Sequence, residues 1–266
     1  MKGAAMPVRL FHSSTGKGPP LVLLHPVGLD HSFWGPLIEK ASAIHTVIAV
    51  DLAGHGHSDA AEYGRAIAAY ADDIRALLDE LGLARSALLG LSFGGMIAQE
   101  FAATHPERLS FIVVGACGAR IPPEARAAVR ARGETDPVTG MTGVAEVTLE
   151  RWFTPGFMAS ESVRRVRERL LADETAGWAA GWDAIAGFDV HDRLGSINAP
   201  ALVIAGERDA GTSVAATREM ADAIRGAEFS VLSGAPHMMQ IEHADRFTDR
   251  VMRFLRERHA DASQPR

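Results

Sequence analysis

The chain has 266 residues, of which 47% are hydrophobic and 23% are charged, and its formal net charge at pH 7 is -6. This balance excludes a disordered or fibrous protein, and the mixed acidic and basic residues form no basic stripe of the kind that binds nucleic acid. The single cysteine, Cys117, excludes an internal disulfide, and no Cys/His cluster indicates a zinc site. Because no segment rich in Gly, Ser and Pro divides the chain, we expect one domain with an insertion.

The beginning of the chain carries no pattern typical of a targeting signal. Gly18, Pro19 and Pro20 precede the first apolar run, residues 21–24, which is too short for the core of a signal peptide. The longest apolar stretch, around residues 111–119, is far shorter than the roughly 20 residues that cross a bilayer. We therefore expect a cytoplasmic protein with no membrane partner.

Short β-branched or Leu-rich runs alternate along the chain with longer stretches rich in Ala, Arg, Glu and Leu, a pattern typical of parallel strands joined by helices. Several short runs are apolar throughout, as in strands that helices cover on both faces. We therefore predict an α/β fold with a mostly parallel central sheet flanked by helices. The predicted strands are residues 8–11, 21–25, 46–51, 86–91, 109–115, 201–205 and 228–232, and the clearest helices are residues 66–81 and 244–258.

Residues 120–194 interrupt this alternation. No strand is predicted there, and the segment consists of helical stretches rich in Arg and Ala. Three of the chain's four tryptophans lie within it: Trp152, Trp178 and Trp182. We interpret residues 120–194 as a helical cap inserted into a core of residues 1–119 and 195–266. Its aromatic side chains either line a substrate pocket or pack the cap onto the core.

Residues 90–95 read Gly-Leu-Ser-Phe-Gly-Gly and lie between an apolar predicted strand and a helical stretch at residues 96–103. This G-x-S-x-G pattern, with a strand before it and a helix after it, predicts a nucleophile elbow. The glycines let the backbone turn sharply, which lifts the Ser92 hydroxyl above the edge of the sheet. The N-terminus of the helix also favours developing negative charge. Ser92 is therefore the candidate nucleophile.

A serine hydroxyl needs a base to remove its proton, and the base needs an acid to orient it. Asp209 follows the buried predicted strand at residues 201–205, and His237 follows the next predicted strand, residues 228–232, so we expect both side chains at the carboxyl edge of the sheet. Their chain order, Ser then Asp then His, differs from the two familiar serine-protease orders. Glu207, two residues before Asp209, is the second candidate for the acid.

Acyl transfer also needs two N–H donors for the oxyanion. The backbone N–H of Phe93, directly after the nucleophile, supplies the first. We expect the second in the His-Pro-Val-Gly loop at residues 25–28, where Val27 is the better candidate because Pro26 has no N–H. We interpret His25 as a brace for this loop, not as a base.

Four segments together resemble the α/β-hydrolase superfamily over nearly the whole chain. They are residues 25–30, residues 51–58, the motif at residues 90–95, and the pair Asp209 and His237. The glycine-rich second segment matches neither pattern of a phosphate-binding loop, so we interpret it as a structural turn.

The predicted cap narrows the resemblance. Residues 151–157 and 178–192 resemble the cap of 3-oxoadipate enol-lactonases, enzymes of aromatic catabolism that open an enol-lactone with water. Trp178 and Trp182 depart from that pattern, since smaller residues are expected there. We expect the substrate pocket to include Trp152, Trp178, Trp182 and Met238.

The resemblance implies a carboxylic ester hydrolase or lactonase of EC 3.1.1 type that acts on a small-molecule substrate through an acyl-enzyme. It implies Ser92, Asp209 and His237 as the catalytic triad, the N–H groups of Val27 and Phe93 as the oxyanion hole, and no metal or cofactor. A general carboxylesterase and a cofactor-free perhydrolase are the alternatives on the same fold, and a small-molecule receptor is the alternative of another class.

The resemblance to enol-lactonases also implies a positively charged group in the substrate pocket. The free carboxylate of an enol-lactone needs a cationic partner, and the predicted cap offers several arginines. The candidates are Arg126, Arg130, Arg132, Arg151, Arg164, Arg165, Arg167 and Arg169.

Overall fold

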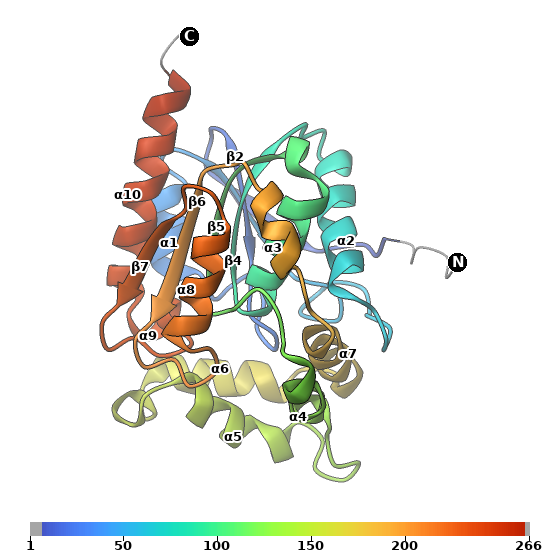
Figure 1. Cartoon of the computed structure of the whole chain (residues 1–266). Coiled ribbons are helices and arrows are strands. Elements are labelled where there is room, and N and C mark those ends of the chain that lie inside the picture. Colours follow the sequence, from blue (N-terminus) through green and yellow to red (C-terminus); the bar gives the residue numbers. More distant parts are fainter. Residues whose placement is uncertain (1–6, 264–266) are drawn as a thin grey trace.

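The computed structural model describes residues 7–263, and its strands form one seven-stranded sheet (Figure 1). The strands lie in the order β1-β3-β2-β4-β5-β6-β7, and every neighbouring pair is parallel except β1 with β3. The predicted α/β fold with a mostly parallel sheet is therefore confirmed. The strands are β1 (His12–Thr15), β2 (Pro20–Leu24), β3 (Thr46–Val50), β4 (Ser86–Leu91), β5 (Leu109–Gly115), β6 (Ala201–Gly206) and β7 (Glu228–Leu232).

Six of the seven predicted strands agree with the structure to within one residue at each end. The prediction of a strand at residues 8–11 is wrong, because the first strand lies at His12–Thr15. The backbone of the predicted segment bonds with the loop after β3: the Phe11 N–H donates to Ser58 Oγ over 2.8 Å. Local composition does not reveal this, since the acceptor lies far along the chain.

Helices cover both faces of the sheet. Those outside residues 120–194 are α1 (Gly35–Ala41), α2 (Ile67–Glu80), α3 (Phe93–Thr104), α8 (Val214–Ala223), α9 (Met239–Glu242) and α10 (Ala244–Ser263). α1 and α10 pack on one face, and α2, α3 and α8 pack on the other. Side chains alternate along β2. Leu21 and Leu23 therefore pack on the face covered by α1 and α10, whereas Val22 and Leu24 pack on the face covered by α2, α3 and α8. This two-sided burial explains why β2 and β6 are apolar throughout.

The two clearest predicted helices correspond to α2 and α10, and α10 continues beyond its predicted end to Ser263. The helix expected from residue 96 begins earlier, at Phe93, because it follows the turn at Ser92 directly. Within the described part of the chain, no helix has both the length and the apolar composition needed to cross a bilayer. Short 3₁₀ segments lie at Pro106–Arg108, Pro123–Ala125, Ala131–Gly133, Pro155–Phe157 and His191–Ser196.

The helices between β5 and β6 lie together beyond the carboxyl ends of the strands (Figure 1). They are α4 (Arg126–Arg130), α5 (Thr142–Trp152), α6 (Glu161–Leu171) and α7 (Thr175–Ala186). The segment returns to the place where it began, since the Val190 N–H donates to Ala119 O over 2.9 Å. We therefore propose that residues 120–194 form a cap on the rest of the chain. The ends of the predicted core, residues 1–6 and 264–266, lie outside the described residues.

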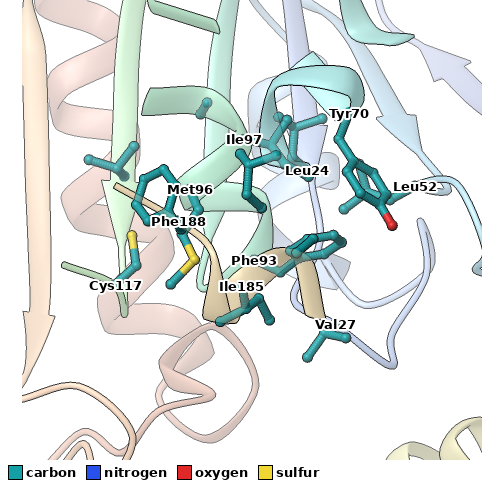
Figure 2. Close-up of a cluster of buried hydrophobic side chains, with 14 of the residues drawn as sticks. Leu24, Val27, Leu52, Tyr70, Phe93, Met96, Ile97, Cys117, Ile185 and Phe188 are labelled. Carbon is teal, nitrogen blue, oxygen red and sulfur yellow. The ribbon is translucent and has the colours of Figure 1, made fainter. Parts of the chain in front are cut away.

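One apolar cluster joins the sheet, α3 and the proposed cap (Figure 2). In it, the side chains of Val27 and Phe93 lie with Ile185 of α7. Val27 and Phe93 are no more than 1% exposed. The two residues predicted to supply oxyanion donors are therefore anchored by their own side chains in a packed core.

The docking of α7 generates a prediction about stability. A Cβ on Gly177 would lie 2.1 Å from Gly54 O, whereas a Cβ on Gly156 would meet no atom within 4 Å. We expect Gly177→Ala to lower the free energy of unfolding by about 1–3 kcal/mol, because α7 must shift away from the loop. The control Gly156→Ala should change it by less than about 0.5 kcal/mol. Urea unfolding measures both, and equal effects of the two substitutions would contradict this packing.

Candidate active site

Ser92 occupies a strained turn between β4 and α3. Its backbone angles are φ 53° and ψ -117°, a conformation that costs a non-glycine residue about 1–3 kcal/mol. Neighbouring backbone leaves no room for side chains at the flanking glycines. A Cβ on Gly94 would lie 2.0 Å from Leu24 O, and one on Gly90 would lie 2.1 Å from Gly94 O. The Gly-x-Ser-x-Gly spacing is therefore required by close approach of the chain to itself.

The structure brings the three predicted triad residues together. His237 Nε2 lies 2.9 Å from Ser92 Oγ, and His237 Nδ1 lies 2.9 Å from both carboxylate oxygens of Asp209. All three side chains are buried. With Nδ1–H donating to the carboxylate, Nε2 is left to accept the serine proton.

Asp209 is held in its ionised form. Burial favours the neutral acid, but the interactions with His237 and with the N–H groups of Thr212 and Gly211 outweigh it and lower the pKa of the carboxyl. Those two N–H groups donate to Oδ1 over 2.9 and 2.7 Å. The loop after β6 therefore fixes both the charge and the position of the carboxylate.

Glu207, the second candidate for the acid, faces elsewhere. Its Oε2 accepts hydrogen bonds from Ser233 Oγ (2.9 Å) and from the Gly234 N–H (2.7 Å). These residues belong to the loop that leads to His237. Glu207 thus supports that loop, and the geometry favours Asp209 as the partner of the imidazole.

The two predicted oxyanion donors lie in neighbouring segments, Phe93 at the start of α3 and Val27 in the loop after β2. The Gly94 N–H donates to His25 O over 3.2 Å, which joins the start of α3 to the loop after β2. Among the described residues, neither the Val27 N–H nor the Phe93 N–H has a hydrogen-bond acceptor. Both donors are therefore available to a ligand atom.

His25 braces the same loop, as its position in the sequence suggests. Its Nδ1 lies 2.7 Å from Pro26 O, and its Nε2 accepts the Leu52 N–H over 2.9 Å. Burial, and then the nearby His55, lower the pKa of this imidazole well below its usual value. The neutral ring therefore serves as a fixed connection between two loops.

A cavity of about 260 Å³ opens onto Ser92 and His237. Its walls come from the loops after β5 and β6, from α5, from α7 and from the segment around α4. Of the predicted pocket residues, Trp152 and Trp182 line it. Trp178 and Met238 do not lie in its lining.

Trp178 and Met238 have packing roles instead. The ring of Trp178 lies against Gly28, where a Cβ would come within 2.8 Å of it, and its Nε1–H donates to Arg132 O over 3.0 Å. Met238 is fully buried, and its N–H donates to Trp152 O over 3.1 Å. The aromatic or apolar character of a residue in the sequence does not show whether its side chain packs in the core or contacts a substrate.

Several residues that line the cavity were not predicted from the sequence, among them Met96, Ile185 and Thr212. Helical spacing in the sequence could have identified two of these three residues. Met96 lies one turn after Ser92, and Ile185 lies three residues after Trp182, so each shares a helix face with a predicted site residue. Thr212 follows Asp209 in a loop, where no periodicity guides a prediction.

Arg169 ties the proposed cap to the loop that carries Val27. Its Nε lies 2.7 Å from Asp30 Oδ2, and its Nη2 lies 2.7 Å from Asp173 Oδ1. The three side chains are no more than 15% exposed. Helix α6 is therefore joined to the loop after β2 by a largely buried ion network.

Comparisons with known proteins agree with this fold. The family described as the alpha/beta hydrolase fold matches residues 19–244. The chain is 32% identical to 3-oxoadipate enol-lactonase 2 of Acinetobacter baylyi, over 93% of each chain. It is 29% identical to the pimeloyl-[acyl-carrier protein] methyl ester esterase of Aliivibrio salmonicida, over 94% of this chain and 97% of that one.

A solved structure is also similar over most of the chain. The enol-lactonase from Burkholderia xenovorans superposes with a TM-score of 0.87 at 34% sequence identity, covering 93% of this chain and 96% of that one. Because the superposition covers 93% of this chain, it includes most of the segment between β5 and β6.

The ion network at Arg169 generates a prediction. We expect Arg169→Gln to lower the free energy of unfolding by about 3 kcal/mol, because it leaves the Asp173 carboxylate buried without a cation. The control is Arg167→Gln, two residues away, which breaks a surface pair with Glu146 (2.6 Å) and should cost less than about 1 kcal/mol. Urea denaturation compares the two variants. A cost at Arg169 no greater than that at Arg167 would show that the network does not hold the cap.

Proposed function

The chain belongs to the α/β-hydrolase fold family and is a carboxylic ester hydrolase, and from that premise we propose that it opens 3-oxoadipate enol-lactone through an acyl-enzyme on Ser92. The observation that carries the mechanism is the position of His237, with Nε2 at 2.9 Å from Ser92 Oγ and Nδ1 against Asp209. The similarity to enol-lactonases over 93% of the chain supports the substrate.

In the first step, Ser92 Oγ attacks the carbonyl carbon of the lactone while His237 Nε2 takes its proton. The carbonyl oxygen becomes an oxyanion and accepts the N–H groups of Val27 and Phe93. Asp209 stabilises the imidazolium that forms. When the tetrahedral intermediate collapses, the ring C–O bond breaks, and His237 returns the proton to the departing enol oxygen.

In the second step, water attacks the acyl carbon, and His237 again accepts a proton. The Ser92 ester bond breaks, Oγ regains a proton from His237, and the free acid leaves. The enol released by ring opening tautomerises to a ketone, so the product is an oxo acid. A simple ester follows the same steps, with an alcohol leaving after the first.

A general carboxylesterase is the second candidate. The 29% identity to a methyl ester esterase over 94% of the chain favours it. The two candidates share the triad and differ in the substrate that the cavity selects.

The nucleophile and the substrate are tested together. We expect Ser92→Ala to lower kcat/KM by at least about a thousandfold on every substrate, because no acyl-enzyme can form. Initial rates are measured on 3-oxoadipate enol-lactone and on p-nitrophenyl acetate and octanoate. A kcat/KM for the enol-lactone orders of magnitude above those for the esters supports the enol-lactonase, and the reverse supports the general esterase. Rates of the unsubstituted chain no higher than those of Ser92→Ala would refute both.

The identity of the acid is tested by a matched pair. We expect Asp209→Asn to lower kcat by about 10³- to 10⁴-fold, since the amide no longer holds the imidazole in the required tautomer. Glu207→Gln should lower it by less than about tenfold, because that carboxylate only supports a loop. Steady-state kinetics of both variants decide the assignment, and a larger loss at Glu207 would reverse it.

A further inference from the structure

The cavity that holds Ser92 carries positive charge. Three arginines line it, Arg120, Arg132 and Arg151, and no Asp or Glu belongs to the lining that the structure describes. Arg120 forms an ion pair with Glu219 (2.9 Å), which compensates its charge. Neither Arg132 nor Arg151 pairs with a carboxylate of any described residue. Two uncompensated guanidinium groups therefore border the space beside the nucleophile.

The other arginines considered for a substrate carboxylate are occupied or lie elsewhere. Five pair with acidic side chains, and Arg165 lies over the Phe33 ring at 5.9 Å, outside this cavity. The five pairs are Arg126 with Asp189, Arg130 with Asp183, Arg164 with Glu161 and Glu168, Arg167 with Glu146, and Arg169 with Asp30 and Asp173. Only Arg132 and Arg151 of the eight combine a free charge with a place in the cavity wall.

Arg132 is held in a defined position. Its guanidinium lies over the Trp182 ring at 5.4 Å, and its carbonyl oxygen accepts the Trp178 Nε1–H over 3.0 Å. Partial burial, and then the charge of Arg151, lower the pKa of this guanidinium, which nevertheless stays protonated at neutral pH. A bound anion reduces the electrostatic repulsion between these two guanidinium groups in the half-buried wall.

The shape of the site selects the kind of anion. A guanidinium presents a planar fork of donors that matches a carboxylate. The cavity, at about 260 Å³, is smaller than most ligand pockets, which measure about 300–1,000 Å³, and this size suits a short chain. A short acyl group can therefore place its carbonyl at Ser92 and a second polar group at the arginines.

We infer that Arg132 and Arg151 form a carboxylate subsite, so that the enzyme selects esters and lactones of short acids that carry a second, free carboxylate. This inference rests on the proposed function for the reacting carbonyl at Ser92. It adds the two residues that recognise the far end of the substrate.

A pair of substrates of equal shape tests the subsite. Methyl hydrogen glutarate carries a terminal carboxylate where methyl 5-methylhexanoate carries an isopropyl group, and methanol release measures both. We expect the kcat/KM of the acid ester to exceed that of the neutral ester by at least about tenfold. Arg132→Gln and Arg151→Gln should each reduce this ratio by at least about tenfold. Arg167→Gln, which removes one charge from the surface of α6, should leave the ratio unchanged.

Two results would overturn the inference while leaving the proposed function intact. They are turnover of the neutral ester at least as efficient as that of the acid ester, and an unchanged ratio in both arginine variants. Thermal unfolding of each variant shows that the folded protein is being assayed.

A binding measurement removes the dependence on turnover. Glutarate is titrated by calorimetry into Ser92→Ala, alone and combined with Arg132→Gln or Arg151→Gln. If the two arginines form a carboxylate subsite, glutarate should bind Ser92→Ala at least about tenfold more tightly than it binds either double variant. Equal affinities refute the subsite whatever the outcome of the kinetic assays. If the subsite binds glutarate but neither ester is hydrolysed faster than by Ser92→Ala, the proposed function fails and the carboxylate subsite stands.

Discussion

The left-handed backbone at Ser92 is the constraint on which the rest of the site depends. A serine at φ 53° is held there only because the surrounding backbone allows no alternative. Its N–H donates to Gly115 O over 2.9 Å, and Gly94 packs directly against the end of β2. The turn starts α3 directly after Ser92, so the Phe93 N–H, beside the Ser92 hydroxyl, has no hydrogen-bond acceptor among residues 7–263.

Charge compensation separates the structural ionic groups from those that face the cavity. The Asp209 carboxylate is matched by His237 and two N–H groups, and Arg169 is matched by two aspartates. Such groups hold loops and helices in place. Arg132 and Arg151 lack a carboxylate partner among the described residues, and they border the cavity. A protein leaves a partly buried charge unmatched at a cost, and a ligand of opposite charge offsets that cost.

Much of the sheet and of the triad was predictable because both depend on local pattern. Apolar runs identify β4 and β6, and β7 is a short run between turn residues. Parallel strands bring their carboxyl ends to one edge, so residues far apart in sequence meet there. Ser92, Asp209 and His237 each follow one of these strands. The prediction of a strand at residues 8–11 is wrong because the structure of this segment does not depend on local pattern: its backbone partners lie in a loop far along the chain.

The sequence by itself determined six of the seven strands, the helices α2 and α10, the turn at Ser92 and the two strand ends that carry Asp209 and His237. Each follows from periodicity or from a glycine requirement within a few residues. Only the tertiary structure decided which tryptophans line the cavity, that Glu207 faces a loop, and which arginines keep a free charge. Those properties depend on what packs against a side chain. Trp178 and Trp182 occupy one helix, yet Trp178 covers Gly28 and Trp182 borders the cavity, because the contacts of each come from other parts of the chain.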